Sequence, residues 1–139
     1  MDRNLILLVE DNPDHAALVS RLIQRASSNC EIDIAENGQE MFEKVALKRL
    51  PKLILLDINM PGKDGIECLK ELRAIKEYTH VPVIMLTTSQ ANKDISMSYE
   101  AGCNAYISKS ADFEQMAKSI ESIVEFWIDN NQTINQLTR

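Results

Sequence analysis

The sequence predicts an α/β fold: a doubly wound parallel sheet of five strands, a (βα)5 arrangement with helices on both faces. Short continuous apolar runs alternate with segments of helical periodicity along the 139 residues, and the four glycines fall between these segments. Continuous apolar runs are typical of strands that are buried on both faces, as in parallel sheets. Parallel strands are joined by right-handed helical crossovers, which cover both faces of the sheet.

Five segments are expected to be strands. Three of them are continuous apolar runs, namely Leu5–Val9, Leu53–Leu56 and Val81–Leu86. Glu31–Ala35 alternates polar and apolar residues, which is typical of a half-exposed edge strand. Ala105–Ile107 is a short fifth candidate.

Five further segments carry apolar residues at intervals of three and four, which predicts helices. These are Asp14–Ala26, Gln39–Leu47, Ile66–Ile75, Asn92–Glu100 and Phe113–Ile128.

Apolar stripes are expected on the first and last of these helices. In the first, which follows Pro13, the stripe comprises Ala17, Leu18, Leu22 and Ala26. In the last, it comprises Phe113, Met116, Ala117, Ile120, Ile123, Val124 and Trp127. Asp112 and Gln115 have the spacing of a capping box at the start of that helix.

Composition indicates one domain and argues against two classes of partner. The chain has 15 Lys and Arg against 21 Asp and Glu, a formal net charge of −6. We expect residues 1–130 to form one domain and residues 131–139 to form a polar tail. An acidic chain without a basic stripe repels nucleic-acid backbones and anionic membranes, so neither is an expected partner.

The cysteines and histidines give no metal-ligand pattern. Cys30, Cys68 and Cys103 are odd in number and widely spaced, and we expect free thiols in a reducing compartment. His15 and His80 are interpreted as solvated side chains. No apolar run is long enough to span a bilayer, and the first residues do not have the pattern of a signal peptide, so we expect a cytoplasmic protein.

Carboxylate, hydroxyl or ammonium side chains lie at the carboxyl ends of four of the five expected strands. Glu10 and Asp11 close the first strand, Asp57 the third, Thr87 the fourth, and the fifth runs into Lys109. In such sheets ligands bind beyond the carboxyl ends of the strands. Each residue alone could be a turn, cap or solvated residue, but their shared position at one edge favours a functional site.

Three carboxylates and one ammonium at this edge leave an excess of negative charge. Two carboxylates about 4 Å apart repel by roughly 4 kcal/mol at an effective dielectric constant near 20. A hard divalent cation would offset this repulsion, and Mg²⁺ takes oxygen ligands and is usually completed by a phosphate. Asp57 lies between the acidic pair and Lys109, so it is the candidate nucleophile for a phosphoryl group.

Four segments resemble a known family. In this order and spacing they are similar to the response-regulator receiver domains of two-component signalling, and the resemblance covers nearly the whole chain. It implies a flavodoxin-like fold with the strand order 2-1-3-4-5. It also implies a phosphoacceptor protein, not an enzyme, that promotes its own phosphotransfer and dephosphorylation. The segments are Val9–Asn12, Leu56–Gly65, Leu86–Thr88 and Tyr106–Lys109.

The resemblance implies a Mg²⁺ site at the phosphoacceptor. Asp57 is then both the phosphoacceptor and a metal ligand. Asp11 is a direct ligand, Glu10 acts through water, and the backbone carbonyl of Asn59 is the third protein ligand.

The resemblance also implies a switch. Thr87 bonds the phosphoryl oxygen after transfer, Lys109 pairs with that group, and Tyr106 swings inward when Thr87 moves. The competing interpretation of Tyr106 is a half-buried residue of an edge strand without a switching role.

One residue departs from the usual family pattern. Ser110 follows Lys109 where receivers usually have a proline in a cis bond, and a cis bond before a non-proline residue costs about 2.5–4 kcal/mol. A trans bond would alter how Lys109 is presented. The Lys-Ser pair, with Phe126-Trp127, resembles the small stand-alone regulators that are paired with phytochrome-type histidine kinases.

Two other classes of function, an interaction module and an enzyme, fit these residues less well. A phosphorylation-independent interaction module would lack an acceptor or an acid, and none is missing. A flavodoxin-like carrier would need a phosphate loop rich in glycine and hydroxyl groups, where this chain has Glu10 and Asp11. An aspartate-nucleophile phosphatase would want its D-x-D motif after the first strand, whereas Asp57 follows the third.

The route by which a signal leaves the protein is left open by the sequence. Trp127, with Phe126 and Ile128 beside it, gives more apolar surface than one helix face can bury. Trp127 either packs on its own domain or contributes to an interface. Our hypothesis is a homodimer formed through the last helix and its neighbours, in a protein whose phosphoryl donor is a sensor histidine kinase.

Overall fold

Five parallel strands form the centre of the computed structural model, which describes residues 3–47 and 49–133. Their order is β2-β1-β3-β4-β5, as predicted. Val9, the last residue of β1, is aligned with Ala35 of β2 and Leu56 of β3, so the central strands end together at one edge. The strands are β1 Asn4–Val9, β2 Cys30–Ala35, β3 Leu53–Leu56, β4 Val83–Thr87 and β5 Ala105–Ser108.

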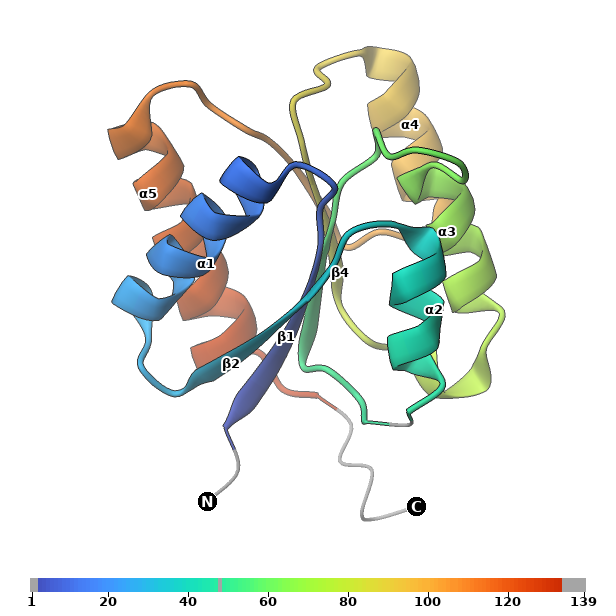
Figure 1. Ribbon diagram of the computed structural model, residues 1–139, viewed down its shortest axis with the longest axis horizontal. Coiled ribbons are helices and arrows are strands. Elements are labelled where there is room, and N and C mark those ends of the chain that lie inside the picture. The colour runs from blue at the N-terminus through green and yellow to red at the C-terminus, as the bar shows by residue number, and fades with distance from the viewer. Residues whose placement is uncertain (1–2, 48, 134–139) are drawn as a thin grey trace.

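Helices cover both faces of the sheet, which confirms the predicted fold class. Figure 1 shows α1 and α5 on one face and α2, α3 and α4 on the other. The α-helices are α1 Pro13–Ala26, α2 Gly38–Val45, α3 Gly65–Arg73, α4 Asn92–Ala101 and α5 Phe113–Ile123. A short 3₁₀ helix, η1 Lys76–Tyr78, precedes β4, and a π-helical segment, η2 Val124–Asn130, continues from α5.

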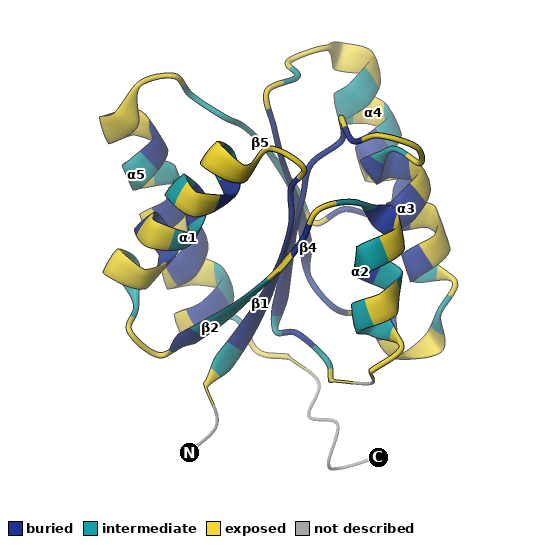
Figure 2. Cartoon of the chain, viewed as in Figure 1, coloured by how far each residue is buried: buried dark blue, intermediate teal, exposed yellow. Residues whose placement is uncertain are grey.

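The strands contribute to two hydrophobic clusters, one on each face of the sheet. Ile54 and Leu56 of β3 belong to the cluster under α2, α3 and α4, whereas Leu53 and Leu55 belong to the cluster under α1 and α5. All four side chains are fully buried, and Figure 2 shows the middle of the sheet as buried. Burial on both faces explains why the sequence of this strand is a continuous apolar run.

The buried face of α1 differs from the predicted stripe. Ala17 is exposed, and the buried residues are Ala16, Val19, Leu22 and Ile23. The prediction that Leu22 lies on the buried face is therefore confirmed, and the prediction for Ala17 is wrong. The helix turns Val19 and Ile23 to the sheet because these larger side chains bury more apolar surface than an alanine does.

The last predicted helix is two segments. The α-helical hydrogen bonding of α5 ends at Ile123. From Val124 the chain continues as the wider π helix of η2. Asp112 caps α5, accepting hydrogen bonds from the amides of Glu114 at 2.9 Å and Gln115 at 3.4 Å. Phe113 is 51% exposed, so its place in the buried stripe was wrong.

The predicted polar tail lies mostly outside the described residues, which end at residue 133. Within the described ranges, no helix is both long and apolar enough to cross a membrane. Cys30, Cys68 and Cys103 are free and buried, as expected. Burial raises the pKa of the Cys68 thiol to about 11, so this thiol is inert.

Candidate functional site

Glu10, Asp11 and Asp57 come together beyond the carboxyl ends of β1 and β3. One carboxylate oxygen from each residue lies within 4.8 Å of the other two. Glu10 and Asp57 are buried, and Asp11 is exposed. The cluster thus opens to solvent on the Asp11 side, and its all-oxygen donor set is of the kind that holds a hard divalent cation.

Burial and like charge both act on Glu10. Its side chain is only 2% exposed, and its pKa is raised, first by burial and then by the neighbouring Asp57 carboxylate. The Lys109 ammonium opposes the rise, and the amide of Asn12 donates a 3.2 Å hydrogen bond to Oε2. The carboxylates therefore repel one another within a partly compensated site.

Lys109 is the buried cation of this site. Its side chain is 7% exposed, and its ammonium pairs with Glu10 and, at 3.3 Å, with Asp57 Oδ2. The amide of Lys109 donates to the carbonyl of Thr87 at 2.7 Å, which extends the pairing of β4 and β5 to this residue. No peptide bond among the described residues is cis, so Lys109 reaches both carboxylates with a trans bond to Ser110.

The loop between β3 and α3 fixes the position of Asp57. The amide of Asn59 donates to Asp57 Oδ1 at 3.4 Å, and the amide of Gly65 donates to the carbonyl of Ile58 at 2.8 Å. A side chain at Gly65 would collide with the carbonyl oxygen of Asp57. The motif therefore needs glycine there, because the start of α3 packs directly on the strand end that carries Asp57.

Thr87 and Tyr106 both contact the loop after β4. Their side chains are not hydrogen-bonded to each other. Thr87 is fully buried, and its Oγ1 is 3.5 Å from the amide of Ser89. Tyr106 is half-buried, and its hydroxyl donates to the carbonyl of Ser89 at 3.0 Å, as the Ser108 hydroxyl does at 3.1 Å. Burial raises the pKa of the Tyr106 phenol. The loop after β4 is thus the physical link between these two predicted residues.

The sequence missed one residue of the site. His15, interpreted as solvated, is half-buried, with its Nδ1 3.1 Å from Lys109 Nζ. The signal that could have found it is its place four residues after Asp11, in the first turn of a helix that begins at the sheet edge.

The Phe126 and Trp127 side chains lie in η2, far along the chain from the acidic cluster. Phe126 is 54% exposed, whereas Trp127 is half-buried and packs against the cluster under α1 and α5. Their rings are in edge-to-face contact, with centroids 4.8 Å apart. Trp127 therefore packs at least partly on its own domain, and the exposed ring is that of Phe126.

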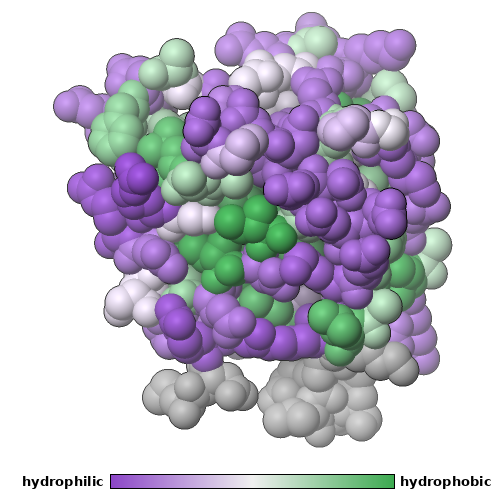
Figure 3. Space-filling view, viewed as in Figure 1, coloured by the Kyte–Doolittle hydropathy of each residue, from purple (hydrophilic) through white to green (hydrophobic). Residues whose placement is uncertain are grey.

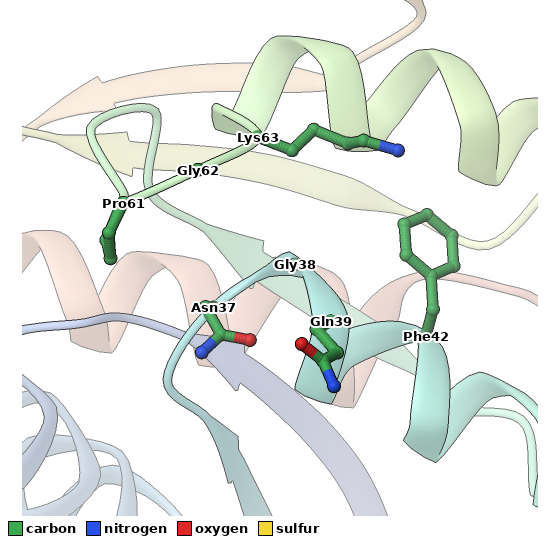
Figure 4. Close-up of a pocket in the computed structure, with 7 residues that line it drawn as sticks. All are labelled: Asn37, Gly38, Gln39, Phe42, Pro61, Gly62 and Lys63. Atoms are coloured by element: carbon green, nitrogen blue, oxygen red, sulfur yellow. The ribbon is translucent and has the colours of Figure 1, made fainter.

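A separate hollow of about 460 Å³ lies between the start of α2 and the loop before α3 (Figure 4). None of the predicted site residues lines it. Its Lys63 pairs with Glu71 at 2.6 Å and lies 5.8 Å from the centre of the Phe42 ring, so this ammonium is already engaged. The lining residues are Asn37, Gly38, Gln39, Phe42, Pro61, Gly62 and Lys63.

The family model for the response regulator receiver domain matches residues 6–121. The chain belongs to the receiver domain family. This receiver is 35% identical to the response regulator Rcp1 of Synechocystis over 132 residues, which is 90% of this chain and 89% of that protein. It is 32% identical to the probable methanogenesis regulatory protein FilR2 of Methanothrix harundinacea over 137 residues, 95% of this chain and 88% of that protein.

Solved structures agree with this assignment. The phosphorylated cyanobacterial phytochrome response regulator RcpA superposes with a TM-score of 0.87 at 33% identity, over 94% of this chain and 97% of that chain. The Mn²⁺-bound form of Rcp1 gives a TM-score of 0.86 at 31% identity, over 95% and 99%. The receiver is therefore a phosphoryl-accepting protein of two-component signalling, a non-enzymatic signalling class.

Proposed function

We propose that this receiver accepts a phosphoryl group on Asp57 from the phosphohistidine of a sensor histidine kinase. The observation that carries the proposal is the buried Asp57 carboxylate, gathered with Glu10 and Asp11 and paired with Lys109. In the transfer, a bond forms from an Asp57 oxygen to phosphorus as the bond from phosphorus to the kinase imidazole nitrogen breaks. The imidazole leaves with the electron pair of that bond.

Mg²⁺ is the cation that we propose for the site. The residues present fit this ion, because Mg²⁺ takes oxygen ligands and one carboxylate oxygen from each of Glu10, Asp11 and Asp57 lies within 4.8 Å of the other two. Asp11, Asp57 and the carbonyl of Asn59 would hold it, with Glu10 acting through water. When bound, it would neutralise charge on the phosphoryl oxygens.

The response to phosphorylation is assigned to the loop after β4. Thr87 would bond a phosphoryl oxygen, which draws its hydroxyl away from the Ser89 amide, and Tyr106 would move inward as the loop shifts. Lys109 would remain paired with the phosphoryl group. We also propose that the receiver promotes hydrolysis of its own acyl phosphate, which ends the signal.

A phytochrome-type histidine kinase is the proposed phosphoryl donor, in a cytoplasmic light-signalling phosphorelay. The support is the likeness to RcpA and, at 26% identity with a TM-score of 0.85, to a response regulator in red light signalling of R. palustris. Phosphotransfer from phytochrome-type kinases should outpace transfer from kinases with other sensors. Equal rates across such a panel would remove the phytochrome assignment.

Homodimerisation through the end of the chain is the proposed output. Phe126 and Trp127 lie in η2, which follows directly on α5, and the Phe126 ring is largely exposed. We assign residues 1–130 to the receiver domain, so both rings lie within it. Sedimentation of the phosphorylated protein should show a dimer that Trp127→Ala or Phe126→Ala weakens, and a monomer under all these conditions would exclude this route.

The decisive experiment for the acceptor is intact-mass measurement after incubation with acetyl phosphate and Mg²⁺. The wild type should gain one phosphoryl group, and Asp57→Asn should gain none. Asp33→Asn is the matched control, because Asp33 lies on β2 and only pairs with Lys44 at the surface. Phosphorylation of Asp57→Asn to the wild-type extent would overturn the proposal.

A further inference from the structure

The Lys109 ammonium uses all three of its protons within the site. Its Nζ contacts Glu10 Oε1, Asp57 Oδ2 at 3.3 Å and His15 Nδ1 at 3.1 Å. An ammonium has three donors and no acceptor. A hydrogen bond between the two groups thus requires Nδ1 of His15 to be the acceptor, with the ring proton on Nε2.

The backbone of His15 is held in place by the start of α1. Asn12 caps this helix, and its Oδ1 accepts hydrogen bonds from the amide of Asp14 at 2.9 Å and from that of His15 at 3.2 Å. Pro13 at the first helical position further restricts the turn. The imidazole thus approaches Lys109 from a fixed helical turn rather than from a free loop.

His15 differs in kind from the other two partners of Lys109. Glu10 and Asp57 are acids of the oxygen cluster, so a cation or a phosphoryl group changes what they bind. The His15 ring carries no carboxylate and lies outside that cluster. Its contact with Lys109 can persist while the carboxylates exchange partners.

We propose that His15 is a positioning residue, which holds the Lys109 ammonium against Asp57 during phosphoryl transfer. This inference rests on the proposed roles of Asp57 and Lys109. Without the imidazole, one ammonium proton loses its partner and the long Lys109 side chain must be ordered in each reaction. Transfer should then slow by about three- to tenfold, the factor expected for ordering one rotamer-rich side chain.

The test compares His15→Ala, His15→Asn and His80→Ala in the intact chain, with phosphoramidate as donor and Mg²⁺ present. Asn places an acceptor oxygen near the position of Nδ1, so it should restore at least half of the rate that His15→Ala loses. His80 is an exposed histidine, so its alanine variant is the matched control and should react at the wild-type rate. Mg²⁺ affinity should be unchanged in both His15 variants, because the oxygen cluster is intact.

The ring nitrogens of His15 provide a readout that a merely structural role would not move. A long-range ¹⁵N–¹H spectrum at neutral pH should show Nδ1 without a proton in the wild type. A proton on Nδ1, or a His15→Asn rate as low as that of His15→Ala, would overturn the inference. If the wild type is phosphorylated on Asp57 and His15→Ala reacts equally fast, this inference alone fails. If the wild type is not phosphorylated on Asp57, both proposals fail.

Discussion

Two cations, Lys109 with its buried side chain and the half-buried Arg73, lie at opposite ends of the strands and are held in different ways. Lys109, at the carboxyl edge, pairs with the acids Glu10 and Asp57. Arg73, at the amino edge, donates to backbone carbonyls, with distances of 2.8 Å to Gly102, 2.8 Å to Tyr78 and 2.7 Å to Val81. Among the residues that the structure describes, no carboxylate pairs with Arg73.

The Arg73 arrangement fixes loops. The guanidinium ties the end of α3 to the turn after α4 and to the segment before β4, and it also donates to Asn104 Oδ1 at 3.0 Å. Gly102 adopts a φ of +109°, and a side chain there would meet the Arg73 Cγ and Nε at 3.2 Å. Burial lowers the pKa of the guanidinium, but arginine stays charged.

The difference shows which edge can respond to a ligand. At the amino edge Arg73 donates to neutral oxygens of the backbone and of Asn104, so its role there is structural. At the carboxyl edge the three acids outnumber the one lysine, so a cation or phosphoryl group can redistribute the contacts. The same charge type is therefore structural in one place and reactive in the other.

The largest expected effect is on stability, at the amino edge. Arg73→Ala removes hydrogen bonds that close three segments and should lower the free energy of unfolding by about 4 kcal/mol in urea titration. Arg73→Lys keeps the charge but not the planar fork, and should recover less than half of that loss. At a temperature where the variants are folded, phosphorylation rates should match the wild type. An Arg73→Ala protein that is as stable as the wild type but is phosphorylated slowly would contradict the structural role of Arg73.

A smaller and Mg²⁺-dependent effect is expected at the carboxyl edge. Lys109→Met leaves buried acids uncompensated and should cost about 3 kcal/mol in unfolding free energy in EDTA. Saturating Mg²⁺ supplies positive charge, so the difference from the wild type should shrink. Lys63→Met, which breaks a surface pair with Glu71, is the control and should show a small difference that Mg²⁺ does not alter. If Mg²⁺ leaves the difference in unfolding free energy between Lys109→Met and the wild type unchanged, this would argue against a cation at this site.

The smallest effect is a pH dependence from Glu10 in metal-free buffer. Burial raises the pKa of this carboxyl above its ordinary value of 4.5, so the folded state binds its proton more tightly than the unfolded state. The Glu10 contribution therefore lowers stability as the pH rises from about 4.5 through the raised folded-state pKa. Glu10→Gln should remove this contribution from unfolding curves measured across that range, and Glu43→Gln, an exposed residue of α2, should not. Identical pH profiles for Glu10→Gln and the wild type would contradict the assignment.

The sequence predicted the parts of the fold that depend on local pattern. Continuous apolar runs identified β1 and β3 because strands buried on both faces have no polar side. The acids and Lys109 were found because each follows a strand, and parallel strands end at the same edge. The helix face of α1 was partly wrong because the predicted stripe included Ala17 and left out the larger apolar side chains of Val19 and Ile23, which pack on the sheet.

Some contacts between distant segments could not be predicted. Arg73 meets Gly102 across 29 residues, with no local pattern that marks the pair. The place of His15 four residues after Asp11 brings it near the site, but it does not identify Lys109, 94 residues away, as its partner. The amount of Trp127 surface that its own domain covers likewise depends on the π turn of η2.

Figure 3 shows a mostly hydrophilic face with hydrophobic atoms near its middle. Ile34 of the edge strand β2 is 38% exposed, as its alternating sequence indicated.

Identification of the phosphorylated residue tests the assignment of Asp57 as the phosphoacceptor most directly. Borohydride reduces an aspartyl phosphate to homoserine, which peptide mass spectrometry can assign to one position. After incubation with acetyl phosphate and Mg²⁺, Asp57 alone should be converted, and no residue should be converted when EDTA replaces Mg²⁺. Conversion of a different aspartate, or none in a protein that has gained a phosphoryl group, would contradict the claim that the carboxyl-edge cluster is the phosphoacceptor site.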